Sequence, residues 1–265
     1  MKLALHTWTL DTTPLPRVLD VVRETGWDGI ELRRVDFLRA AEAGDSAERV
    51  IERVRASGVP VACVGVELGW MWARGDERTR LLQVFDEQCR HAAALGCRTV
   101  MSASDRGRGD LREAAANVRE VGDIAARHGV QVAVEFNSQA EQFNALAPMR
   151  ELLALAGHPR CALLLDAYHL QRSGGKPDDV DDMTAAEIAY VQFSDVPRTG
   201  LVPGAATDRL PPGAGAVPFP EFFRRVAAKG YTGYASYEAP NPQAWARPAS
   251  EVSREALTAT RAVLR

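Results

Sequence analysis

The sequence has few of the features that mark several large classes of protein. Its four cysteines lack CxxC spacing, so neither a structural zinc site nor a disulfide framework is supported. The formal net charge of −3 gives no general attraction to nucleic acids or anionic membranes. No apolar run approaches the length of a membrane span, and the opening MKLALHTWTLDTTP lacks the apolar core of a signal peptide. We therefore expect a cytoplasmic protein that binds neither nucleic acid nor membrane.

The composition is that of a globular protein with a substantial core. Hydrophobic residues make up 46% of the chain and charged residues 25%. A chain of 265 residues can form one large α/β domain or two small ones. No linker or low-complexity segment divides it, so we predict a single domain over residues 1–265.

A helix, a glycine and an apolar strand recur at intervals of about 30 residues, the size of a βα repeat. The glycines that end these helices are Gly26, Gly58, Gly96, Gly129, Gly157 and Gly230. Strands are predicted at 2–7, 28–32, 60–66, 97–103, 130–136, 161–166, 188–193 and 232–238. Helices are predicted at 14–25, 47–57, 76–95, 109–128, 144–156, 218–229 and 249–264, with a loop and a short helical piece in the sixth gap. This alternation predicts a (β/α)8 TIM barrel. A doubly wound open sheet is the alternative, but no GxGxxG follows the first strand.

Polar side chains end four successive strands in the second half of the chain. Glu135, Asp166, Gln192 and Glu238 follow apolar runs typical of strands buried on both faces. A polar group at such a position is costly without a partner. In a (β/α)8 barrel these side chains converge on one side of the catalytic rim, where a hard divalent cation is a shared partner that suits oxygen donors. The simpler alternative pairs each of them with a neighbouring arginine.

Several further motifs accompany these residues. Asp166 opens the segment DAYH, Gln192 lies in VQFSDVPR, and residues 208–215 read DRLPPGAG. By these motifs and their order, the sequence resembles the xylose isomerase-like TIM barrels, a family of sugar phosphate isomerases and epimerases. The family includes ketose 3-epimerases, hydroxypyruvate isomerases, inosose dehydratases and 3-dehydroshikimate dehydratases. The resemblance extends over essentially the whole chain, from LALHTWTL to YTGYASYE.

The resemblance implies one divalent metal ion on the four residues at the strand ends. The ligands would be Glu135, Asp166, Gln192 and Glu238. It also places His169 of DAYH at the substrate, puts Arg209 near the substrate, and makes Arg198, after the strand-seven ligand, a candidate substrate contact. Oxygen ligands favour Mn²⁺ or Mg²⁺, with Co²⁺ and Zn²⁺ as alternatives.

Such a site is suited to removing a proton next to a carbonyl of a small polyhydroxylated substrate. Glu135 and Glu238 would serve as base and conjugate acid, and return of the proton to the opposite face gives an epimer. Loss of a β-hydroxyl, with His169 protonating the leaving oxygen, gives a dehydratase instead. Gln192 stands where ketose epimerases have His, and within the family Gln is associated more with 3-dehydroshikimate dehydratases. The strand-three loop, however, does not resemble theirs, so we favour an isomerase or epimerase and keep the dehydratase as the alternative.

Weaker signals concern the first and third strands. Glu67 is a candidate substrate contact, although an ion pair at the rim accounts for it equally well. Trp70 and Trp72 wall an apolar side of the pocket, sit in a subunit contact or pack in the interior, and Trp70 is a candidate substrate contact. His6 either lines the pocket or is a rim histidine with its own hydrogen bonds. Residues 200–208, GLVPGAATD, form a loop that we expect near the site.

Two other functions were weighed. An endonuclease IV-like enzyme needs several histidines for a multinuclear zinc site, and only two of the five histidines lie near strand exits. A non-catalytic binding protein is compatible with the fold, but the complete set of four donors argues against it. Barrels of the family often dimerise or tetramerise, so a homo-oligomer is compatible with the resemblance, which does not fix the number of subunits.

Overall fold

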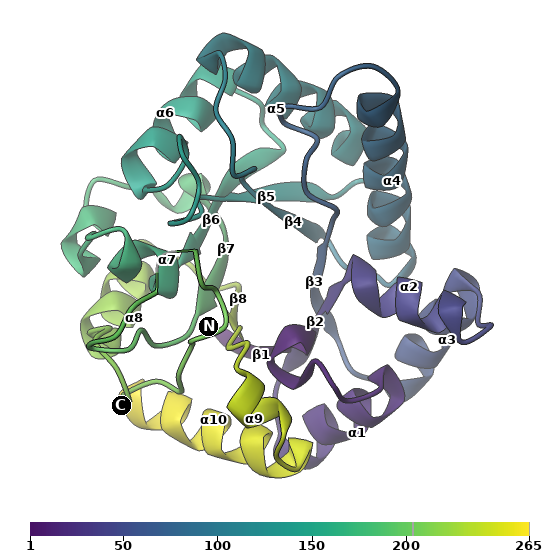
Figure 1. Cartoon of the computed structure of the whole chain (residues 1–265), viewed down its shortest axis with the longest axis vertical. Helices are drawn as coiled ribbons and strands as arrows, with labels where there is room; N and C mark the ends of the chain where they lie inside the picture. The colour runs from purple at the N-terminus through teal and green to yellow at the C-terminus, as the bar shows by residue number, and fades with distance from the viewer. Residues whose placement is uncertain (203, 265) are drawn as a thin grey trace.

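The computed structural model describes residues 1–202 and 204–264, so Pro203 of the predicted loop and Arg265 lie outside it. Within the described chain, eight parallel strands close into a barrel in sequence order, and helices surround them (Figure 1). The strands are β1 Lys2–His6, β2 Gly29–Arg33, β3 Val61–Gly65, β4 Thr99–Ala103, β5 Gln131–Glu135, β6 Cys161–Asp166, β7 Ile188–Phe193 and β8 Tyr234–Tyr237. The barrel prediction is confirmed, and the open sheet is ruled out because β1 pairs with both β2 and β8.

Helices lie outside the barrel and in the loops at its carboxyl end (Figure 1). The α-helices are α1 Leu15–Thr25, α2 Arg34–Glu42, α3 Ala47–Ser57, α4 Gly75–Ala94, α5 Leu111–Arg127, α6 Leu146–Ala156, α7 Ala167–Arg172, α8 Phe219–Ala228, α9 Pro242–Trp245 and α10 Ala249–Val263. Short 3₁₀ helices are η1 Thr7–Leu10, η2 Pro177–Val180 and η3 Ala185–Glu187. Among the described residues, none of these helices combines the length and apolar composition needed to cross a membrane.

The predicted elements agree with the observed ones to within two residues at each end. The glycines predicted to end helices have positive φ; Gly26, for example, has φ 86° and donates its amide to Val22. Three α-helices were missed: α2, α9 and α7, which directly follows β6. α2 begins directly after β2 without a turn residue, because the Asp36 carboxylate accepts the Arg33 amide and stabilises the helix start. α9 is a single turn after β8.

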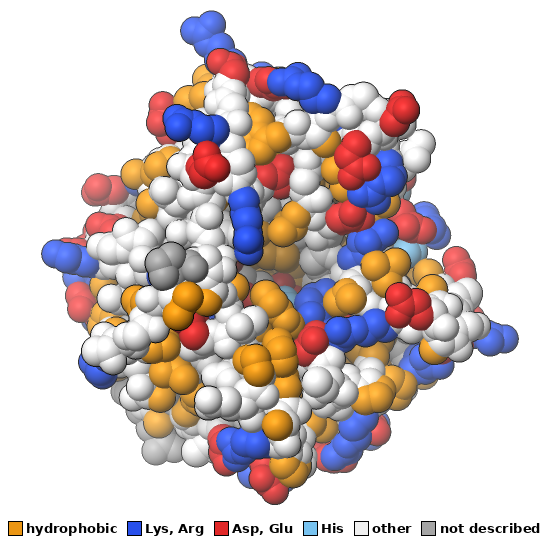
Figure 2. Space-filling view, viewed as in Figure 1, with side chains coloured by type: hydrophobic (Ala, Val, Ile, Leu, Met, Phe, Trp, Pro, Cys, Tyr) orange, Lys and Arg blue, Asp and Glu red, His pale blue; other side chains and the backbone are white. Residues whose placement is uncertain are grey.

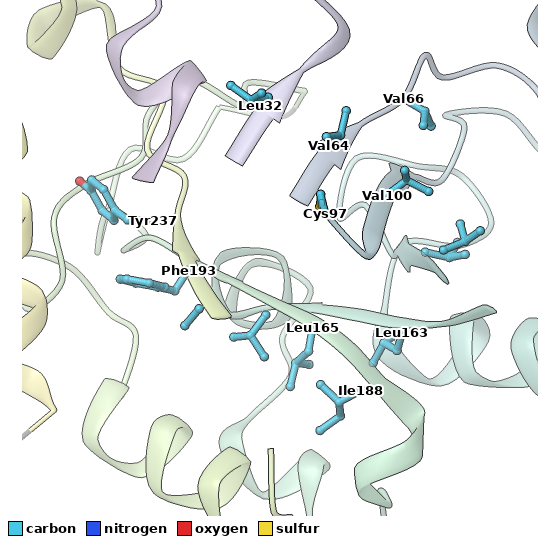
Figure 3. Close-up of a cluster of buried hydrophobic side chains, with 14 of the residues drawn as sticks. Leu32, Val64, Val66, Cys97, Val100, Leu163, Leu165, Ile188, Phe193 and Tyr237 are labelled. Atoms are coloured by element: carbon cyan, nitrogen blue, oxygen red, sulfur yellow. The ribbon is translucent and has the colours of Figure 1, made fainter. Parts of the chain in front are cut away.

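Strand alternation decides which side chains reach the barrel interior. On β5, Ala133 and Glu135 share one face, while Val132 and Val134 share the other. The outward faces pack under the helices in the main hydrophobic cluster, part of which Figure 3 shows with Leu32, Val64 and Phe193. A smaller cluster fills the interior; its members are Ala4, Ala62, Cys63, Met101, Ala133, Leu164 and Tyr190. Because the interior is packed, polar side chains that face inward gather at the strand ends.

Candidate active site

A cavity of about 920 Å³ lies at the carboxyl ends of the strands. Figure 2 shows the molecule hollowed near the centre of this face. The titratable part of the lining includes Glu135, His169 and Glu238. Its apolar part includes Leu38 and Leu68, which are 40% and 47% exposed. The cavity therefore combines a group of charged side chains with an apolar surface, as small-molecule sites commonly do.

The four predicted metal ligands end consecutive strands of the barrel. Glu135 and Asp166 are the last residues of β5 and β6. Gln192 is the penultimate residue of β7, where it is the register partner of Asp166, and Glu238 directly follows β8. All four are buried, and Glu135 and Glu238 line the cavity. Asp166 and Gln192 are fully buried beside them. The structure thus brings all four to one quadrant of the rim.

Arg209 forms ion pairs with two of these carboxylates. Its Nη1 lies 2.9 Å from Asp166 Oδ2 and 2.9 Å from Glu238 Oε2. Its guanidinium lies over the ring of Tyr168, 4.1 Å from the centroid. Burial opposes the positive charge, but Glu238 and Asp166 together raise the pKa of Arg209. The predicted position of Arg209 at the site thus has a structural basis in a buried ion-pair network.

The loop that carries Arg209 is fixed by Asp195. The carboxylate of Asp195 accepts hydrogen bonds from three backbone amides within residues 213–217, at 2.7 to 2.9 Å. Gly215 is required in this arrangement, because a Cβ there would collide with the carbonyl oxygen of Val196. Asp195, which follows the predicted ligand in the strand-seven motif, therefore acts as an anchor for the loop.

The four predicted metal ligands have too few positive charges and hydrogen-bond donors around them. Within the described residues, Glu135 Oε1 and Gln192 Oε1 are buried without a hydrogen-bond partner. Burial, then repulsion from Asp166 and Glu238, raises the pKa of Glu135 well above its ordinary value. Burial also raises the pKa of Asp166 to about 6, although Arg209 lowers it. Unpartnered oxygens among like charges suit a hard divalent cation, so the residues present fit such an ion.

A second combination of residues could also hold a metal ion. Glu135, Asp166 and His169 each offer one ligand atom, and these atoms lie within 4.8 Å of one another. The predicted set shares the first two residues but is completed by Gln192 and Glu238. Both sets use Glu135 and Asp166, whose carboxylates are therefore common to the two candidate cation sites.

His169 lies among a backbone amide, Arg209 and two carboxylates. Its Nδ1 accepts a hydrogen bond from the Ser138 amide at 3.2 Å, and Ser138 Oγ is 2.9 Å away. Arg209 Nη2 lies 3.2 Å from His169 Nε2. Because an amide and a guanidinium can only donate, both ring nitrogens face donors, and these contacts do not favour one tautomer of the neutral ring. Nε2 lies 3.7 Å from Glu135 Oε1 and 3.9 Å from Asp166 Oδ2. Burial, then the charge of Arg209, lowers the pKa of His169 well below its ordinary value. His169 is thus held neutral beside the cavity.

Glu31 is a buried carboxyl of this site that the sequence analysis missed. It lies in β2, and its Oε1 accepts a hydrogen bond from Gln192 Nε2 at 2.8 Å. Burial, then repulsion from Glu238, raises the pKa of Glu31 to about 8. His6, a predicted substrate contact, lines the cavity with its Nε2 3.4 Å from Glu238 and 3.7 Å from Glu31. A glutamate inside the apolar strand GIELR was the signal that could have identified Glu31.

The other predicted substrate contacts are not all at the cavity. Glu67 lines it but pairs with Arg34 at 2.9 Å, as the ion-pair alternative expected. Trp70 is 1% exposed and packs in the hydrophobic core, whereas Trp72 lines the cavity in its place. Arg198 is exposed and is not among the described residues that line the cavity.

Comparisons with known proteins agree with this architecture. The family model described as the xylose isomerase-like TIM barrel matches residues 19–263. The 3-dehydroshikimate dehydratase of Pseudomonas putida is 24% identical over 262 residues, which cover 97% of this chain and 41% of that protein. The inosose isomerase of Halalkalibacterium halodurans is 22% identical over 261 residues, covering 95% of this chain and 92% of that protein. The chain thus spans about two fifths of the length of the dehydratase.

The solved structures include one that covers both chains almost completely. The IOLI protein, described with a binding zinc atom, has a TM-score of 0.90 and 19% identity; the match covers 100% of this chain and 98% of that chain. At this identity the likeness shows the shared barrel fold.

Proposed function

Because the chain belongs to the family of xylose isomerase-like TIM barrels, we propose that it is a metal-dependent isomerase or epimerase of a small polyhydroxylated carbonyl compound. The observation that carries this proposal is the group of buried oxygen donors at the ends of β5 to β8, two of which have no hydrogen-bond partner within the described chain. Glu135, Asp166, Gln192 and Glu238 would hold one divalent ion. When bound, such an ion supplies a Lewis acid that polarises the substrate carbonyl.

The proton chemistry is assigned to side chains that line the cavity. Glu135 or Glu238 would take the proton from the carbon next to the carbonyl, and the C–H electron pair would pass into an enolate. Return of a proton from the other glutamate to the opposite face would give the epimer. Return to the neighbouring carbon, with a proton moved between the two oxygens, would give the isomer. His169, neutral and beside the cavity, would orient a substrate oxygen by a hydrogen bond.

A dehydratase is the second candidate, because the fourth donor is the neutral carboxamide Gln192 and a 3-dehydroshikimate dehydratase matches 97% of this chain. In this reaction the electron pair freed by proton removal expels a β-hydroxyl group. His169 would orient that group, and the glutamic acid formed in the first step would return the proton with which it leaves as water. The first step is shared with the isomerase, so the two candidates use the same base and differ in the fate of the enolate.

The test is deuterium incorporation from D₂O, followed by proton NMR, with Mn²⁺-loaded protein and a panel of ketoses, keto-inositols and 3-dehydroshikimate. Deuterium at the carbon next to the carbonyl, together with an isomeric product, supports the isomerase or epimerase. A new vinyl or aromatic signal supports the dehydratase. Exchange that persists unchanged in Glu135→Gln and in Glu238→Gln would overturn the assignment of the base.

A further inference from the structure

The carboxamide of Gln192 points in an unexpected direction. Its Nε2 donates to Glu31 Oε1 at 2.8 Å, which leaves its Oε1 buried and without a partner within the described residues. Asp166 is its register partner on β6. An amide beside a carboxylate would ordinarily turn its N–H toward that carboxylate, where it gains a charge-assisted hydrogen bond. Here the N–H points to Glu31 in β2. The oxygen is therefore the atom left to join Glu135, Asp166 and Glu238 as a metal ligand.

The surroundings of Glu31 account for this orientation. Glu31 Oε1 faces two nitrogens, Gln192 Nε2 and His6 Nε2 at 3.7 Å. His6 Nδ1 accepts the amide of Trp8, so the neutral ring carries its proton on Nε2. Glu31 Oε1 therefore has an N–H group on each side, one from Gln192 and one from His6. If the Gln192 amide turned over, its oxygen would face the oxygen of Glu31 across the same short distance.

Glu31 is also held firmly in place. It is fully buried in β2, between Ile30 and Leu32, whose side chains belong to the main core cluster. The bond to Gln192 joins residues 161 positions apart in the sequence, because β2 and β7 meet only across the barrel. A rigid acceptor at this place fixes the amide more strictly than a surface side chain would.

We propose that Glu31 is a positioning residue, which turns the Gln192 carboxamide so that oxygen, and not nitrogen, completes the donor cluster of Glu135, Asp166 and Glu238. This inference rests on the proposed function, since it needs that cluster to bind a divalent cation. A metal-bound histidine commonly donates its second ring N–H to a carboxylate, which fixes the ligand atom. Gln192 and Glu31 reproduce that arrangement with an amide: the nitrogen is held by the Glu31 carboxyl group and the oxygen is left as the ligand.

The test compares Mn²⁺ affinity by isothermal titration calorimetry in matched variants. Glu31→Gln keeps the volume but offers Gln192 both a donor and an acceptor, so the nitrogen of Gln192 is free to turn toward the carboxylates. We expect Mn²⁺ to bind about 10- to 100-fold more weakly, the usual effect of losing a partner that orients a ligand. The control is Asp36→Asn, a buried acid that bonds Thr7 and Arg33 instead, and its affinity should stay within about twofold.

A double-mutant cycle separates positioning from a general loss of structure. Gln192→Ala should weaken Mn²⁺ binding by itself, and adding Glu31→Gln to it should cause no further loss, because the residue that Glu31 positions is gone. Melting temperatures of all variants accompany the titrations. Additive losses in the cycle, or wild-type affinity in Glu31→Gln, would overturn the role of Glu31 while leaving the metal site intact. A wild-type protein that binds no Mn²⁺ would overturn the metal site and this role together.

Discussion

Replacing Arg209 by glutamine should destabilise the protein strongly, and more so at high pH. The guanidinium is 3% exposed, and its Nη1 lies 2.9 Å from oxygens of both Asp166 and Glu238. Removing one partner of a buried ion pair costs about 3–5 kcal/mol, because the remaining charge stays buried. We expect about 3 kcal/mol in metal-free protein at pH 8, the lower end of this range, because the carboxyls of the variant can take up a proton.

The pH dependence follows from the sign of the pKa shifts. Arg209 lowers the pKa of Asp166, which burial has raised to about 6 in the folded protein. Without Arg209 this pKa rises further, so the folded variant holds a proton that the unfolded chain has released, and its stability falls as pH rises. Near pH 4, well below the pKa of about 6, Asp166 is protonated in the folded wild type as well as in the folded variant, so the part of the difference that comes from Asp166 should shrink toward zero.

Urea unfolding with EDTA at several pH values between 4 and 8 measures the effect. The exposed Arg198, replaced by glutamine, is the matched control and should change the free energy of unfolding by less than about 0.5 kcal/mol. A loss below about 1 kcal/mol in Arg209→Gln, or one that does not depend on pH, would show that the buried ion pairs do not have the energetic role assigned to them.

Three further outcomes are expected. Glu135→Gln and Glu238→Gln should each slow deuterium exchange by about 10³-fold while far-ultraviolet circular dichroism stays unchanged, and full exchange in both would contradict their role. Asp195→Ala removes the acceptor of three backbone amides in the Arg209 loop and should cost about 3 kcal/mol in thermal unfolding; a change under about 0.5 kcal/mol would contradict the anchoring. Mn²⁺ at about 100 times its Kd should add about 2.7 kcal/mol to the free energy of unfolding, reversibly on chelation, and no gain in calorimetry would count against the site.

The repeat architecture could be predicted from the sequence because its signals are local. Glycines in the left-handed conformation end the helices, and apolar strands follow within a few residues. The strand ends then identify Glu135, Asp166, Gln192 and Glu238, since each lies at the carboxyl end of its own strand or directly after it. α2 was not predicted, because it starts without a turn residue after β2 and no local signal separates the two elements.

The environment of the site could not be predicted, because it depends on contacts between distant strands. The bond between Glu31 and Gln192 crosses the barrel, and the ion pair between Arg209 and Asp166 depends on a loop that Asp195 fixes. Which of two tryptophans in one loop reaches the cavity depends on tertiary packing as well. Periodicity indicates which face a strand residue occupies, but not its partner on another strand.

The most direct test of the proposed metal site is a crystal structure of the protein soaked in Mn²⁺, with anomalous scattering to locate the ion. We expect a single strong peak coordinated by Glu135, Asp166, Glu238 and the oxygen of Gln192, with Glu31 still bonded to the Gln192 nitrogen. A peak away from these four residues, or no peak at saturating Mn²⁺, would contradict it.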